Sequence, residues 1–145
     1  MARRLGADAA VGADGDVGAA VRGANGGRLP DLVVVCTGAP PALRQAAELV
    51  DQGGTVLYFA PAGPDFSLSL PFNRLWRDEV TLTTSYGAAP ADLRSALDTL
   101  ASGAVDVEPM ITHRLPLSEA QRGFRLVAQA GESMKVILHP HGSPS

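Results

Sequence analysis

Three short segments of this chain are candidates for a binding site, because each stands at the end of an expected strand. They are residues 36–38, 59–61 and 83–86. In an open parallel sheet, ligands bind outside the carboxyl ends of the strands, where loops diverge and helix N-termini present free N–H groups. The three segments therefore predict a crevice at such an edge. Taken alone, Gly38 indicates a tight turn equally well.

The familiar motifs of phosphate, metal and nucleophile chemistry are missing from the sequence. No two of its 16 glycines are spaced as G-x-G, so the dinucleotide fingerprint G-x-G-x-x-G is absent. The patterns G-x-x-x-x-G-K-[ST], H-E-x-x-H and G-x-S-x-G are absent as well. Motifs therefore identify neither a pyrophosphate cradle nor a metal site nor a serine nucleophile.

The remaining reactive side chains are sparse. His113 falls in an expected extended segment, and His139 and His141 fall in the C-terminal tail; because no metal-ligand spacing links them, we interpret them as surface residues. Cys36, the single cysteine, is expected to be an inert buried thiol and excludes an intrachain disulfide. The mixed charge run over residues 74–79 is typical of a solvated helix end.

The composition limits the classes of protein to which this chain could belong. The 145 residues are enough for one core, and 46% hydrophobic with 19% charged residues argues against disorder. A net charge of -3 gives no basic surface for nucleic acid or membrane, and no apolar stretch approaches the length of a membrane span. Together with a single cysteine, this favours a cytoplasmic protein without nucleic-acid or membrane partners.

Strand and helix signals alternate along the chain, which predicts an α/β layered sheet with a right-handed crossover over residues 37–54. The expected strands cover residues 31–36, 55–60, 80–85 and 134–138, an edge strand at 66–70, a weaker one at 9–11, and extended chain at 107–115. The expected helices cover residues 16–22, 40–50, 71–77, 90–102 and 118–129, the last opened by a capping box of Ser118 and Gln121.

Three blocks of the sequence carry a resemblance to a known family: VVVCTGAPPAL, GGTVLYFAPAG and EPMITHRLPLSEAQRGFRLVAQAGESMKVIL. Over residues 5–140 the chain resembles the cofactor-domain half of the zinc-type, medium-chain alcohol, sorbitol and threonine dehydrogenases. The resemblance implies an incomplete Rossmann-like doubly wound parallel sheet over residues 1–140. The polar, proline-containing tail at 141–145 is expected to be mobile from its composition. The first two strands, the glycine fingerprint and the zinc-binding domain would then precede Met1.

The resemblance also implies an NAD or NADP site, whose affinity we expect to be weak or lost in this chain. Thr37 and Gly38 match positions that approach the adenosine and ribose. Lys135 matches a basic residue near the pyrophosphate. The family's zinc ligands and proton-relay residues have no counterparts here, so we expect neither a catalytic residue nor a metal ligand.

On the nicotinamide side, the resemblance assigns two further stretches. Tyr58, Phe59 and Ala60 match the stretch whose backbone faces the nicotinamide. Phe59 departs from the small residue common at its position. The residues that match the edge meeting the carboxamide are Thr83, Thr84 and Ser85.

In function, the resemblance implies hydride transfer between an alcohol and a nicotinamide cofactor, with this chain inactive alone. Two alternatives remain open: a truncated dinucleotide-binding or dimerisation module without catalysis, and a non-functional gene fragment. The family's dimers imply a homodimer through edge strands at residues 66–70 and 80–85. With the first strands missing, the edge beside residues 32–36 would be exposed as well.

Overall fold

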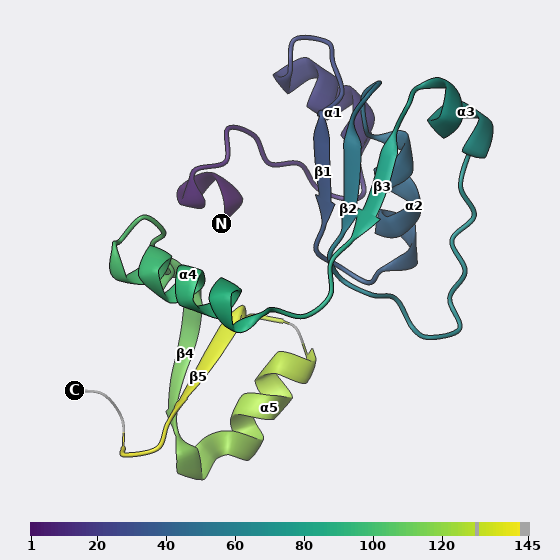
Figure 1. Ribbon diagram of the computed structural model, residues 1–145. Helices are drawn as coiled ribbons and strands as arrows, with labels where there is room; N and C mark the ends of the chain where they lie inside the picture. Colours follow the sequence, from purple (N-terminus) through teal and green to yellow (C-terminus); the bar gives the residue numbers. More distant parts are fainter. Residues whose placement is uncertain (130, 143–145) are drawn as a thin grey trace. The chain divides into compact units, whose positions relative to one another are not determined.

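The chain folds into two compact units, Met1–Gly87 and Ala88–Ser145. The structure is a computed structural model that describes residues 1–129 and 131–142 (Figure 1). We refer to the two parts as the N-terminal and the C-terminal unit. The assignment of residues 1–140 to one partial dinucleotide-binding domain stays a prediction, and residues 143–145 of the expected tail lie outside the described residues.

The N-terminal unit is built on a three-stranded parallel sheet in the order β1 (Leu32–Val35), β2 (Thr55–Tyr58) and β3 (Thr81–Thr84). Each strand is short, β-branched and flanked by turn residues, as the sequence indicated. The register sets Val33 beside Val56, and Val56 beside Leu82. The predicted α/β class with a parallel sheet is therefore confirmed.

Three helices accompany this sheet: α1 (Val17–Ala24), α2 (Pro40–Glu48) and α3 (Phe72–Arg77), after a 3-10 turn η1 (Ala2–Leu5). Asp16 caps α1, since its side chain accepts the N–H of Ala19 at 2.9 Å. Pro40 opens α2, where the fixed φ of proline suits the first helical turn. These three helices were expected close to their observed limits.

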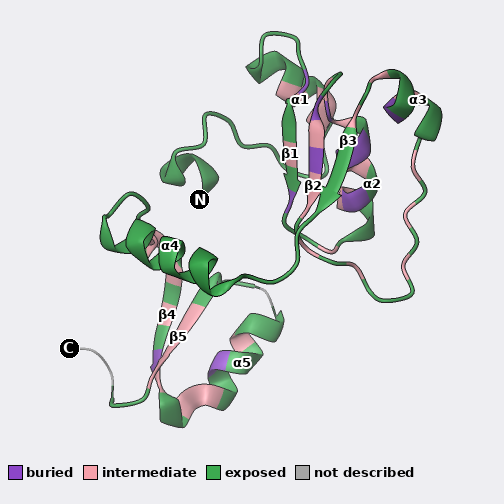
Figure 2. Ribbon diagram, in the orientation of Figure 1, coloured by how far each residue is buried: buried purple, intermediate pink, exposed green. Residues whose placement is uncertain are grey.

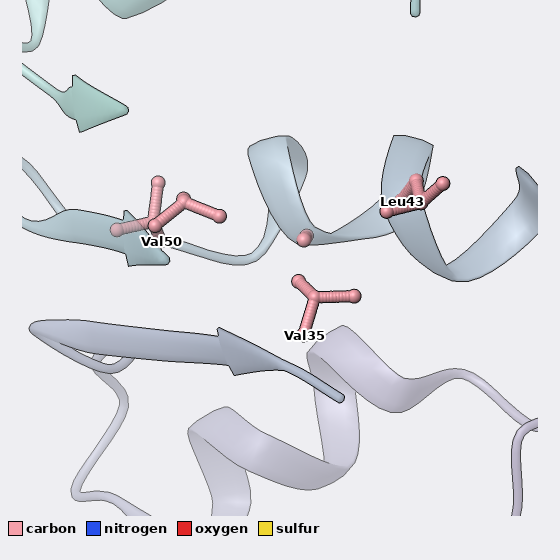
Figure 3. Packing of buried hydrophobic residues seen from close by; sticks show 5 residues of the cluster. Val35, Leu43 and Val50 are labelled. Carbon is pink, nitrogen blue, oxygen red and sulfur yellow. The ribbon is translucent and has the colours of Figure 1, made fainter. Parts of the chain in front are cut away.

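The core of the N-terminal unit lies between the sheet and α2 (Figure 2). Val35 and Val56 of the sheet are buried together with three residues of the helical crossover, Leu43, Ala46 and Val50. Figure 3 shows Val35 pointing toward α2 between Leu43 and Val50. Because side chains alternate along a strand, Leu32 and Val34 point to the opposite face, where they are 58% and 47% exposed.

Arg74 joins α3 to the C-terminal end of α2. Its Nη1 donates to the carbonyl of Ala47 at 2.6 Å and its Nη2 donates to the carbonyl of Val50 at 2.8 Å. Its Nε donates to Asp78 at 3.2 Å, which fixes the plane of the guanidinium. A cation at a helix C-terminus is favourable because the last carbonyls lack intrahelical partners. The predicted solvated charge run is therefore wrong for Arg74 and Asp78, both of which are partly buried.

We predict that Arg74→Leu lowers the free energy of unfolding by about 1–3 kcal/mol, because two carbonyls lose a charged donor. Arg77→Leu is the matched control, since Arg77 is an exposed arginine of the same helix. Urea unfolding of both variants at neutral pH makes the comparison. An equal effect of the two substitutions contradicts the assigned role of Arg74.

The C-terminal unit contains a two-stranded parallel sheet of β4 (Ile111–Pro116) and β5 (Lys135–His139). Its helices are α4 (Pro90–Ala101) and α5 (Ala120–Gln129), with 3-10 turns η2 (Glu108–Met110) and η3 (Leu117–Glu119). Gly123 lets α5 approach the sheet, because a Cβ there would lie 3.2 Å from Leu138 and 3.3 Å from Val136.

A register shift between Ile111 and His113 leaves Thr112 as an extra residue in β4. Its hydroxyl takes over part of the backbone ladder: it accepts the N–H of Met134 at 3.0 Å and donates to the carbonyl of Lys135 at 3.2 Å. Such an irregularity redirects the side chains that follow it. The sequence showed no sign of this irregularity.

Two expected strands do not form in the described residues: 9–11 and 66–70 are both irregular. Phe66 and Leu68 instead pack against the core formed with α2, and Arg44 lies 5.5 Å from the centre of the Phe66 ring. The alternation at residues 66–70 therefore reflects a loop with one buried side rather than a hydrogen-bonded ladder.

The expected start of α5 is also wrong. The chain enters α5 through the turn η3 after Pro116, and Ser118 lies inside that turn without capping the helix. The helix reaches Gln129, and the residue after it lies outside the described residues, so its predicted end there stays a prediction. Within the expected extended segment 107–115, residues 108–110 form the turn η2 before β4 begins.

Two reactive residues differ from expectation. Cys36 is exposed rather than buried. It follows Val35, the last residue of β1, and by alternation its side chain lies on the side of the sheet away from the core. His139 belongs to β5 instead of the tail and is half-buried. Its Nε2 is buried and has no hydrogen-bond partner among the described residues.

None of the helices in residues 1–129 and 131–142 has the length and hydropathy needed to cross a membrane.

Candidate functional site

A hollow of about 450 Å³ lies at the carboxyl ends of β2 and β3. None of its lining residues is charged, and apolar or aromatic side chains predominate. The lining residues are Leu43, Tyr58, Phe59, Ala60, Pro61, Ala62, Gly63, Phe66, Leu68, Thr84, Ser85 and Tyr86. We call this feature the carboxyl-edge hollow. Its position agrees with the crevice predicted from the sequence.

The parallel sheet determines which residues reach this hollow. β2 is the central strand, so its carboxyl end is flanked by those of β1 and β3. The N–H groups of Phe59 and Ala60 both donate to the carbonyl of Val35 at 3.1 Å, which holds the chain beside β1 after β2 ends. On the other side, the N–H of Ser85 donates to the carbonyl of Tyr58 at 3.4 Å. These bonds continue the sheet past its last paired residues.

Tyr58 links the hollow to α2. Its hydroxyl donates to the carbonyl of Leu43 at 3.3 Å. Burial raises the pKa of the Tyr58 phenol above its ordinary value of 10.0, because the charged form is poorly solvated there. The side chain of Tyr58 therefore contributes to the packing of α2, while its backbone takes part in the sheet between β1 and β3.

We predict that the free energy of unfolding falls as the pH rises above about 10, where the unfolded state ionises Tyr58 before the folded state does. The contribution is fully present below the unfolded pKa and is lost as pH rises through the higher folded pKa. Tyr58→Phe removes this term, so its stability should decline less steeply between about pH 9 and about pH 11. Urea unfolding across that range makes the measurement, and identical declines contradict the prediction.

Thr37 and Gly38 lie in the loop after β1. The hydroxyl of Thr37 accepts the N–H of Ala39 at 3.2 Å, which holds the loop in a turn. A Cβ placed on Gly38 would overlap the carbonyl oxygen of Pro61 and lie 3.0 Å from the carbonyl carbon of that residue. Gly38 is therefore required by the neighbouring loop of this chain, a contact that the sequence did not reveal.

The structure brings five of the nine proposed cofactor-binding residues together at the carboxyl-edge hollow: Tyr58, Phe59, Ala60, Thr84 and Ser85. Thr37 and Gly38 do not line the hollow. Gly38 contacts Pro61, which is one of the lining residues. Thr83 pairs with Leu57 in the sheet and, by alternation, points to the face opposite Tyr58.

Lys135 is the remaining proposed residue and belongs to the C-terminal unit, where it is exposed as the first residue of β5. There it lines a small, mainly apolar hollow of about 350 Å³ whose other lining residues are Leu100, Val107, Met110, Ile111 and Ile137. Its proposed role near the pyrophosphate stays a prediction.

Sequence reasoning missed Leu43, Phe66 and Leu68 as lining residues. For Phe66 and Leu68 the signal is the alternation of apolar residues after Pro64, a pattern that also predicts a strand. Tyr86 belongs to the third candidate segment, residues 83–86, but is not among the nine proposed cofactor-binding residues. Its side chain is 99% exposed at the rim of the hollow.

The residues present do not fit a zinc ion. Within residues 1–129 and 131–142, no three His, Cys, Asp or Glu side chains gather closely enough to hold a metal. A structural or catalytic zinc needs at least three such protein ligands. No chemical step is therefore assigned to zinc in this part of the chain.

The sequence model of the zinc-binding dehydrogenases matches residues 1–102 of this chain. The chain belongs to the zinc-binding dehydrogenase family. The recognition of this family from the three sequence blocks is thereby confirmed.

Relatives with known sequences or structures agree with this assignment. An uncharacterized zinc-type alcohol dehydrogenase-like protein of Escherichia coli K12, YdjL, is 34% identical over 95% of this chain. Among solved structures, a zinc-binding dehydrogenase of Sinorhizobium meliloti 1021 bound to NADP is 26% identical, with a TM-score of 0.83 over 96% of this chain. The alcohol dehydrogenase TADH of Thermus sp. ATN1 is 30% identical, with a TM-score of 0.78 over 95% of this chain.

The chain spans well under half the length of these relatives: 38% of the Escherichia coli protein, 41% of the Sinorhizobium structure and 40% of the Thermus structure. The activity of a whole dehydrogenase therefore involves residues beyond those that match this chain.

Proposed function

We propose that this chain forms the nicotinamide-facing part of an NAD(P)-dependent zinc-type alcohol dehydrogenase. In such an enzyme a hydride passes between the carbon of an alcohol and C4 of the nicotinamide, while the protein supplies binding and orientation. The observation that carries the proposal is the carboxyl-edge hollow, where the segments after β2 and β3 converge on a site without charged side chains.

The chemistry of the hollow suits a flat, amide-bearing ring. Apolar and aromatic side chains exclude water from the ring, and a few polar groups fix its orientation. The hydroxyls of Thr84 and Ser85 are the polar groups at the β3 side of the hollow. Phe59 is 58% exposed beside them, so it adds an aromatic surface where a small residue is common in this family.

We propose that the zinc ligands and the proton-transfer residues of the reaction come from outside this chain. The described residues offer no zinc ligand set, and we expect none of them to transfer a proton to or from the alcohol. The NADP bound to the Sinorhizobium relative supports a dinucleotide as the ligand. The chain alone should therefore bind a dinucleotide weakly and oxidise no alcohol.

We predict that the purified chain changes the fluorescence of NADH or NADPH on titration and that Ala60→Leu abolishes this change. The added methyl groups would fill the hollow, where Ala60 is half-buried. Ala91→Leu is the matched control, because Ala91 is exposed in α4 of the C-terminal unit.

Two results would overturn the proposal. No fluorescence change at millimolar NADH and NADPH contradicts dinucleotide binding, and equal binding by wild-type and Ala60→Leu contradicts the location of the site. Zinc-dependent oxidation of an alcohol by the purified chain contradicts the expectation that the chain is inactive alone.

A second proposal is self-association through the edge of β3, which keeps open the alternative of an assembly module. All four residues of β3 are exposed, and among the described residues β3 is an edge strand without a charged or proline residue to block pairing. The other predicted dimer strand, residues 66–70, does not form, so it is no longer part of this proposal.

We predict that Thr83→Lys shifts the chain toward the monomer, because a lysine on the strand disfavours edge-to-edge pairing. Sedimentation velocity over a range of protein concentrations measures the change. Ser69→Lys, in the exposed part of the preceding loop, adds the same charge away from β3 and should leave the distribution unchanged. A wild-type chain that stays monomeric contradicts the proposal.

A further inference from the structure

The loops after β1 and β2 touch each other at backbone level. The carbonyl oxygen of Pro61 occupies the space of the missing Gly38 side chain, and the Cα of Ala62 lies 3.4 Å from the same position. The backbone angles at position 38 do not require a glycine, since Gly38 is not among the residues with positive φ. Its small size therefore matters because of Pro61.

Each loop is held by hydrogen bonds of its own. The loop after β1 is held by the turn in which Thr37 accepts the N–H of Ala39. The loop after β2 is held by the two N–H groups of Phe59 and Ala60 on the carbonyl of Val35. With both loops anchored, the contact of Gly38 with Pro61 fixes the distance between them, and a larger residue must push the loops apart.

We propose that Gly38 is a positioning residue that joins these two loops into one wall and so sets the spacing between the two halves of a bound dinucleotide. This inference rests on the proposed function, which places the nicotinamide at the carboxyl-edge hollow, and on the family resemblance, which implies an adenosine side at residues 37–38. Two linked ligand halves gain affinity from their linkage only when the distance between their two sites matches the length of the linker. A change in the spacing therefore weakens the whole dinucleotide more than either half.

The test compares Gly38→Ala with wild type for three probes: 5′-AMP, reduced nicotinamide mononucleotide, and whichever of NADH and NADPH binds the wild-type chain. Linkage raises affinity by about 10²–10⁴ when the geometry allows it. Gly38→Ala should weaken the dinucleotide about tenfold or more and change each half by less than about twofold. Calorimetric titration measures all three affinities.

Gly12→Ala is the matched control, because a Cβ at Gly12 meets no atom within 4 Å and the residue lies far from the loops in sequence. It should leave all three affinities unchanged. A merely structural effect of Gly38→Ala would reduce the fraction of folded chain and weaken the three probes equally, which overturns the inference. Unchanged dinucleotide affinity in Gly38→Ala overturns it as well.

A wild-type chain that binds no dinucleotide refutes the proposed function, and with it the inference. If Gly38→Ala does not fold, Pro61→Gly tests the same contact between the two loops. This substitution changes the loop after β2 and adds no atoms at the contact. It should weaken the dinucleotide more than either half, because the spacing is no longer fixed. Equal weakening of the three probes by Pro61→Gly contradicts the role of the wall.

Discussion

The parallel pairing of β2 with both β1 and β3 is the constraint on which the candidate site depends. It places the carboxyl ends of three strands at one edge, so that the chain leaving β2 and the chain leaving β3 border the same hollow. The burial of Val35 and Val56 under α2 stabilises that pairing, since these valines contact the helix from adjacent strands. Any change that moves α2 therefore also moves the wall of the hollow.

Arg74 and Tyr58 attach α2 at two points. Arg74 binds carbonyls at the C-terminal end of the helix, and Tyr58 donates to the carbonyl of Leu43 near its beginning. A helix held at both ends gives the loops after β1 and β2 a fixed base. The contact of Gly38 with Pro61 then sets the distance between those loops.

Much of this fold could be predicted from local patterns. The apolar run of β1, the proline that opens α2 and the apolar spacing along α2 are all local signals, and the α/β class followed from their alternation. Arg74 and Gly38 could not be predicted in the same way, because their partners lie 23 or more residues away in sequence. Residues 66–70 were misassigned since alternation arises both in strands and in loops packed on one side.

The candidate residues of the site came from a family resemblance, and their spatial grouping came from the sheet. The sequence contained no glycine fingerprint or metal motif that would have identified the site unaided. The absence of charge in the hollow is a property of the folded chain, because Leu43, Phe66 and Thr84 come from a helix, a loop and a strand.

The most direct test of the central claim is a titration of the ¹⁵N-labelled chain with NADPH and NADH, followed by amide chemical shifts. The account predicts that the largest shifts cluster at the carboxyl edge, at Phe59, Ala60, Thr84 and Ser85. A second hollow, lined by Arg22, Gly27, Arg28, Leu29, Asp51 and Gln52, is one alternative location in the N-terminal unit. Shifts confined to that hollow, or no shifts at millimolar cofactor, would contradict the assignment.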